Sequence, residues 1–128
     1  MLPRRHRLTR PDDFRAVLRG GPGRQRRRRA GTDLLVVHVA SAEPTPSPTR
    51  RPPRVGFVVS KAVGNSVVRH RVVRRLRGLV GGRLDQLPDG LDLVVRAQPP
   101  AAAATSTQLG DALDRALARV LEKSGADR

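Results

Sequence analysis

The stretch RVGFVVSKAVGNSVVRHRVVRRLR, residues 54–77, joins two contrasting patterns within one short segment. Its first part, RVGFVVSK, alternates larger apolar residues with small ones, which predicts a half-buried strand. The letters VGNS then supply a turn, with Asn65 or Ser66 as the helix N-cap. A helix is predicted from about Val67 to Val80, where Gly81 and Gly82 end it.

The predicted helix separates its aliphatic side chains from its cationic ones. Stepping about 100° per residue places one apolar stripe within about 140°, wide enough to cover a sheet; it contains Val68, Val72, Val73, Leu76, Leu79 and Val80. The other side of this helical wheel carries the cationic residues His70, Arg71, Arg74, Arg75 and Arg77. Arg69 lies at the edge of the apolar arc, so it must extend outward or meet a partner near the helix start.

This cationic face has no acidic neighbours to balance it. The chain carries no Asp or Glu between Glu43 and Asp85, whereas like charges at i,i+3 and i,i+4 destabilise an isolated helix. Phosphates of a nucleic acid would neutralise the face and release counterions. Binding of RNA or DNA is therefore the favoured interpretation, and a merely solvated face is the alternative.

Composition limits the remaining function classes. The 128 residues carry a net charge of +15, and residues 1–84 hold 21 Lys or Arg against four acids, a regional charge of +17. Such a one-sided field favours a polyanionic partner over a membrane surface, because the chain has neither Trp nor Tyr for an interfacial helix. There is no cysteine, secretion signal or membrane-spanning run, so a soluble cytoplasmic protein is expected.

The rest of the chain predicts a small α+β protein. A short helix starts near Pro11, and residues 20–32 look like a basic loop, although a further short strand can lie within 24–33. Strands are predicted at 34–40 and 91–97, with a proline-rich connector at 41–53. Thr105 and Gln108 form a capping box for a final helix over about 106–123.

The sequence contains no recognisable machinery for cutting a nucleic acid. His6, His38 and His70 are not at metal-ligand spacing, and no group of carboxylates could hold two divalent ions. The letters SKAVGNS do not have the order or spacing of a phosphate-binding Walker loop. The chain is thus predicted to bind nucleic acid without catalytic residues or a metal site of its own.

Residues 54–77 closely resemble the signature block of the protein subunit of bacterial ribonuclease P, as do the preceding LTRPDDFRAVLRGG and the following DLVVRA. The resemblance covers about residues 7–97. It implies a two-layer α+β sandwich of a roughly four-stranded sheet with helices and a left-handed strand-helix-strand crossover, forming one RNA-binding domain over residues 1–128. It also implies that a partner RNA uses Mg²⁺ to remove the 5′ leader of precursor tRNA, with no obligatory protein partner and no membrane.

The resemblance also assigns roles to particular residues. The Arg-Asn-Arg helix motif of the family falls on Arg69, His70 and Arg71, followed by Arg74 and Arg77, and Arg75 adds a further charge. Ser60, Lys61 and Asn65 would contribute to RNA binding beside the helix. For the leader groove, Phe14 matches a family aromatic residue, while Leu18 and Val37 stand where aromatics often occur. Two other hypotheses remain, a structural RNA-binding module such as a basic ribosomal protein and a protein-only nuclease.

Overall fold

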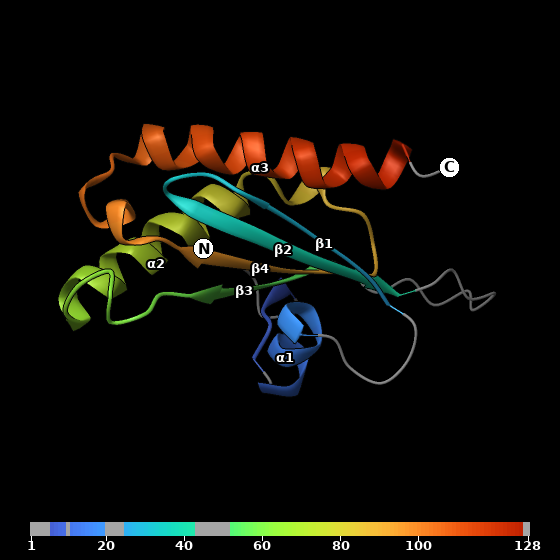
Figure 1. Ribbon diagram of the computed structural model, residues 1–128, viewed down its shortest axis with the longest axis horizontal. Helices are drawn as coiled ribbons and strands as arrows, with labels where there is room; N and C mark the ends of the chain where they lie inside the picture. Colours follow the sequence, from blue (N-terminus) through green and yellow to red (C-terminus); the bar gives the residue numbers. More distant parts are fainter. Residues whose placement is uncertain (1–5, 10, 20–24, 43–51, 127–128) are drawn as a thin grey trace.

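The computed structural model describes residues 6–9, 11–19, 25–42 and 52–126 (Figure 1). Its elements follow one another along the chain as α1 (Pro11–Arg19), β1 (Gln25–Gly31), β2 (Leu35–Ala42), β3 (Arg54–Val58), α2 (Ser66–Gly81), η2 (Leu84–Gln86), β4 (Leu91–Ala97), η3 (Pro99–Ala103) and α3 (Ser106–Ala126). The α+β class predicted from the sequence is confirmed.

The strands form one mixed four-stranded sheet in the order β1-β2-β4-β3. β2 pairs with both β1 and β4 in antiparallel register, whereas β3 and β4 are parallel neighbours. Two adjacent parallel strands need a crossover connection, and here α2 supplies it. The predicted strand-helix-strand unit is therefore the part of the fold that carries the cationic helix.

β1 corrects the expectation of a basic loop over residues 20–32. Four consecutive arginines of this segment lie in a strand that pairs with β2 through seven residue pairs, from Gln25 with Ala42 to Gly31 with Val36. The residues have little strand propensity of their own. The backbone ladder to β2 holds them extended, and the short strand that the sequence allowed within 24–33 is the one that forms.

The main core lies on one face of the sheet, under α2 and α3 (Figure 1). Leu35, Val37 and Val39 of β2 point to this face, since alternate residues of a strand share one side. The apolar side of α3 packs on them, with four completely or almost completely buried side chains at helical spacing: Leu109, Leu113, Leu117 and Val120. The capping box is present, because Thr105 and Gln108 exchange hydrogen bonds of 2.9 and 3.1 Å.

A smaller core occupies the other face, where α1 is the only helix among the described residues (Figure 1). Its buried members are Leu8, Val17, Ala40 and Val94, and Phe14, Leu18 and Val58 pack against them. α1 covers only part of this face. The predicted connector begins later than expected, because β2 continues to Ala42, and residues 43–51 lie outside the described part of the chain.

Candidate nucleic-acid interface

The loop that leads into α2 is fixed by local contacts. The Oδ1 atom of Asn65 accepts a hydrogen bond of 3.0 Å from the Val68 amide, so this residue caps the helix. Gly64 lies so close to the first turn that a Cβ atom there would be 2.8 Å from Cγ1 of Val68. Ser60 and Lys61 are exposed at the start of this loop. Asn65, predicted to bind RNA, has a structural role as the N-cap.

Five of the six residues in the predicted apolar stripe of α2 pack in the main core, and Val73 instead lines a surface cleft. Val72, Leu76 and Val80 are at most 1% exposed, and Val68 and Leu79 pack against the same core. On the outer side, His70, Arg74 and Arg77 are exposed. The predicted separation of the two chemistries is therefore confirmed for these positions.

Arg71 and Arg75 depart from that prediction. An Nη2 donor of Arg71 reaches the carbonyl oxygen of Ala102 at 3.3 Å, and Nη1 of Arg75 reaches that of Ala104 at 3.0 Å. Both side chains are half-buried, so they tie α2 to the η3 segment rather than point freely outward. The wheel placed them on the cationic side correctly but could not show that η3 lies against it.

Arg69 lies half-buried at the first turn, as its place at the edge of the apolar arc predicted. Its Nε atom and that of Arg71 are buried, and neither has a hydrogen-bond partner among the described residues. A buried donor without a partner costs about 1–3 kcal/mol. The two guanidinium groups thus retain a donor each that the described part of the chain does not satisfy.

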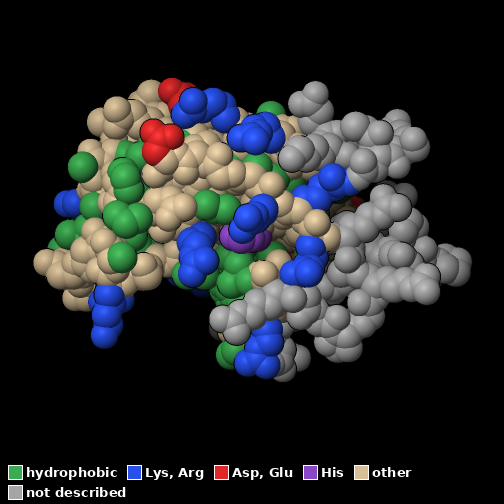
Figure 2. All heavy atoms as spheres, viewed as in Figure 1, with side chains coloured by type: hydrophobic (Ala, Val, Ile, Leu, Met, Phe, Trp, Pro, Cys, Tyr) green, Lys and Arg blue, Asp and Glu red, His purple; other side chains and the backbone are tan. Residues whose placement is uncertain are grey.

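On the α1 side of the sheet, a cleft of 280 Å³ lies between α1, β1 and β2; we call it the β1-side cleft. It is lined by Val17, Leu18, Arg27, Arg28, Arg29 and His38. Figure 2 shows Lys and Arg side chains gathered around a histidine on this side of the molecule. Burial lowers the pKa of His38, and the charges of Arg96 and Arg29 lower it further. Both effects favour the neutral form of the imidazole.

Val37 was predicted in the leader groove, and the structure contradicts this. Its side chain is completely buried in the main core, on the face opposite α1. A shift of one residue along a strand moves a side chain to the other face, and the neighbouring His38 lies on the α1 side. The polar member of the run LLVVHVA was the signal that could have shown which residue of β2 faces α1.

A second cleft, of 310 Å³, lies on the other side of α1 at the outer edge of β3; we call it the β3-edge cleft. Phe14, Phe57, Val73, Arg7 and Arg77 are among the residues that line it. The Phe14 ring lies directly over Gly56, because a Cβ atom there would be 2.3 Å from Cζ of the ring. Phe14 lines this cleft and Leu18 lines the β1-side cleft, while both side chains pack against the same small core.

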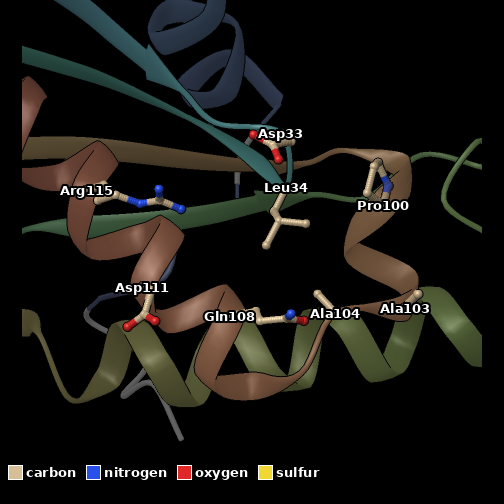
Figure 3. A pocket seen from close by; sticks show the side chains of 8 residues that line it. All are labelled: Asp33, Leu34, Pro100, Ala103, Ala104, Gln108, Asp111 and Arg115. Atoms are coloured by element: carbon tan, nitrogen blue, oxygen red, sulfur yellow. The ribbon is translucent and has the colours of Figure 1, made fainter.

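A further cavity of 340 Å³ lies between the β1–β2 turn, η3 and α3 (Figure 3). Arg115 extends from α3 toward Leu34, and Asp33 and Asp111 also line the cavity (Figure 3). No residue predicted to bind RNA lines it, and its two carboxylates do not favour an RNA phosphate. We therefore do not assign the nucleic-acid interface to this cavity.

None of the described helices is long and apolar enough to cross a membrane. Within the same residues, there is no group of three or more His, Cys, Asp or Glu that could hold a metal ion.

Comparison with known proteins shows which family has this sequence and fold. The family model of ribonuclease P matches residues 2–121. The chain is 52% identical over 124 residues to the ribonuclease P protein component of Streptomyces griseus, covering 94% of this chain and 96% of that protein. It is 48% identical over 120 residues to the corresponding protein of Nocardioides sp., covering 94% and 95%.

Solved structures agree in fold. The ribonuclease P protein of Staphylococcus aureus superimposes with a TM-score of 0.70 at 22% identity, covering 93% of this chain and 94% of that one. That of Thermotoga maritima gives 0.68 at 19% identity, covering 89% and 96%. The fold class is thus that of a small basic α+β protein with a cationic crossover helix.

The chain belongs to the family of bacterial ribonuclease P protein components. It is therefore part of a ribonucleoprotein endoribonuclease that acts in tRNA processing, with an RNA subunit as its partner. This assignment decides between the hypotheses that the sequence left open, in favour of the resemblance and against a ribosomal protein or a protein-only nuclease.

Proposed function

We propose that this chain binds the catalytic RNA of ribonuclease P through the outer side of α2 and holds the 5′ leader of precursor tRNA against the α1 side of the sheet. The observation that carries the first part is the exposed set His70, Arg74 and Arg77, beside Ser60 and Lys61. The sequence places no acid between Glu43 and Asp85 to neutralise it. Phosphates are the groups that such a cationic surface binds.

Binding of the leader is supported by the β1-side cleft. Leu18 offers an apolar surface there, and the neutral imidazole of His38 can stack on an unpaired base, as aromatic rings do in single-strand recognition. Arg27 and Arg29 stand beside them for the phosphates. In this proposal His38 takes the place that the sequence assigned to Val37.

The chemistry of cleavage belongs to the RNA partner. Mg²⁺ ions, held mainly by that RNA, supply activation of the attacking water and stabilisation of the leaving oxygen. The side chains of this chain contribute by offsetting repulsion between two RNAs and by orienting the leader. We propose that no further protein is required and that the complex works in the cytoplasm.

A reconstitution experiment tests this proposal. The purified chain is added to the cognate catalytic RNA and labelled precursor tRNA at low Mg²⁺, and release of the leader is measured. We expect the chain to increase leader release well above that of the RNA alone, because the added cations replace part of the Mg²⁺ requirement. The absence of any increase would contradict the proposal.

A second measurement isolates the leader contact. The variant His38→Ala should bind precursor tRNA, in complex with the catalytic RNA, about tenfold more weakly, the loss typical of one stacked base. His38→Phe should retain the affinity, and neither variant should alter the affinity for mature tRNA. Equal losses for precursor and mature tRNA would place the leader elsewhere.

A further inference from the structure

We infer that the outer edge of β1 pairs with an extended acidic segment of a protein partner, which adds a strand to the sheet. β1 and β3 form the two opposite edges of the sheet, so this surface is separate from the β3-edge cleft. Three features of β1 support the inference: the direction of its backbone groups, the exposure of its outer side, and its charge.

β1 is an edge strand with one unpaired side. It is the first strand in the order β1-β2-β4-β3, and it pairs in unbroken register with β2. The Thr32 amide donates a hydrogen bond of 2.8 Å to the Leu35 carbonyl at the end of this hairpin, so Thr32 faces β2. Backbone groups alternate in direction along a strand. The N–H and C=O groups of Arg27, Arg29 and Gly31 therefore point away from the sheet.

A contact from α3 supports this direction. The Nη1 atom of Arg119 lies 3.4 Å from the carbonyl oxygen of Gly31, so this carbonyl faces outward and already has a donor. The outward N–H and C=O groups of Arg27 and Arg29 have no hydrogen-bond partner within the described part of the chain. Both residues are exposed. Unpaired groups of this kind on an edge strand form a template for another strand.

The charge of β1 decides which strand can pair there. Its sequence, QRRRRAG, contains four arginines and no acid. Figures 1 and 2, seen from the same direction, show Lys and Arg side chains gathered over β1. Cross-strand neighbours of opposite charge stabilise a sheet. An occupant with Asp or Glu at every second position would place its carboxylates beside Arg27 and Arg29, on the α1 side of the sheet.

A second copy of this chain is disfavoured as the occupant. Two β1 strands that paired with each other would bring the arginines of both copies together, and like charges directly opposite destabilise a sheet. Each chain also carries a net charge of +15. Charged side chains on an edge strand are a common protection against self-association. The arginines thus oppose pairing between copies and favour pairing with an acidic strand.

RNA matches the charge of this edge but not its backbone. Outward N–H and C=O groups occur together at every second residue, about 6.8 Å apart. Phosphate oxygens only accept hydrogen bonds, so they would leave the outward carbonyls of Arg27 and Arg29 without a donor, whereas a peptide strand supplies both groups. Because the same two side chains line the β1-side cleft, such a partner would weaken leader binding there. That consequence rests on the proposed function, and pairing at the edge does not.

Amide exchange tests the pairing directly. The full chain is mixed with a seven-residue peptide in which Glu alternates with Val, and hydrogen exchange is followed by NMR. We expect the Arg27 and Arg29 amides to exchange rapidly in the free chain and at least about tenfold more slowly with the peptide. The Arg28 and Ala30 amides, which face β2, are the internal reference and should change much less.

Two further ligands separate backbone pairing from charge attraction. A peptide of equal charge with Pro in place of Val cannot complete a backbone ladder and should protect neither amide. A single-stranded RNA oligonucleotide of equal charge provides the alternative occupant. Equal protection by the Pro peptide, stronger protection by the RNA, or rapid exchange of Arg27 and Arg29 with the Glu–Val peptide would each overturn the inference. None of these outcomes changes the expected leader release, so the proposed function is judged separately.

A matched pair of variants gives an independent measurement. Arg29→Ala removes the side chain only, whereas Arg29→Pro also removes the outward N–H and keeps the groups of Arg28 that face β2. Proline is tolerated at edge positions of this kind. The Glu–Val peptide should bind Arg29→Pro about fivefold more weakly than Arg29→Ala, because one hydrogen bond is lost. Equal affinities of the two variants would contradict pairing at this backbone.

Discussion

Arg74 and Arg75 are neighbours on one helix, yet the fold uses them differently. Arg74 is exposed, whereas Arg75 donates to the carbonyl of Ala104 and is half-buried. The same contrast separates Arg77 from Arg71, which donates to the carbonyl of Ala102. Arginines of this helix thus fall into a set fixed by the folded chain and a set exposed at the surface, and their sequence neighbourhood does not distinguish the two.

The fixed set also includes Arg54 on β3. Removal of its carboxylate partner should give the largest change in stability. Its Nε and Nη2 atoms each lie 2.9 Å from an oxygen of Asp92, and Asp92 is only 7% exposed. Asp92→Ala leaves the guanidinium without this partner and should lower the free energy of unfolding by about 3 kcal/mol. Chemical denaturation measures it, with the exposed Asp89→Ala as control. A loss no larger than that of the control would place Arg54 outside the fixed set.

The exposed set should affect RNA binding and leave stability unchanged. The double variant Arg74→Ala/Arg77→Ala should reduce the slope of log affinity against log salt by about 2, one for each lost phosphate contact. At low salt the affinity should fall about tenfold, equivalent to about 1.4 kcal/mol. A salt titration of binding to the catalytic RNA measures both quantities. An unchanged slope together with a lower unfolding free energy would reverse the assignment.

Arg75→Ala should show the opposite pattern. Loss of the hydrogen bond to the Ala104 carbonyl should lower the free energy of unfolding by about 1 kcal/mol. The salt slope should change by less than in Arg74→Ala, because one guanidinium edge already faces η3. Thermal unfolding and the same salt titration, run on the two single variants in parallel, compare them. Identical behaviour of both would remove the distinction on which this comparison depends.

The smallest effect is expected where a fixed arginine lies at the surface. The hydrogen bond from Arg83, whose Nη2 atom is 3.1 Å from Oδ2, and the charge of that guanidinium lower the pKa of Asp114. This pair therefore stabilises the fold above the ordinary carboxyl pKa, and the contribution disappears as pH falls through the lowered value. Since the pair is exposed, Asp114→Asn should remove only a few tenths of a kcal/mol at pH 7.

The pH dependence provides the check for that last pair. The difference in unfolding free energy between the parent chain and Asp114→Asn should shrink as pH falls below the ordinary aspartate range. A difference that stays constant down to the lowest accessible pH would show that the carboxylate charge contributes nothing.

Much of this protein could be predicted from short-range patterns. The start of α2 at Asn65 and Ser66, its apolar stripe, and the capping box of α3 all depend on residues a few positions apart. Such signals act within one element, so the sequence contains them completely. The regional excess of positive charge likewise follows from the sequence, and with the signature block it pointed to the family.

Features that depend on distant partners could not be predicted. β1 forms from an arginine run because β2 pairs with it, and Arg71 and Arg75 are tied because η3, about 30 residues away, presents carbonyl groups to them. Whether Val37 or His38 lies on the α1 side of the sheet depended on which face of β2 meets α3.

By itself, the sequence determined that a cationic amphipathic helix follows a strand and that its charge has no acidic counterpart nearby. Only the tertiary structure decided which of those cations are available, since a guanidinium is occupied or exposed according to the carbonyl and carboxylate groups that other segments bring beside it. Local periodicity orients a side chain relative to its own helix. The packing of distant segments determines what that side chain meets.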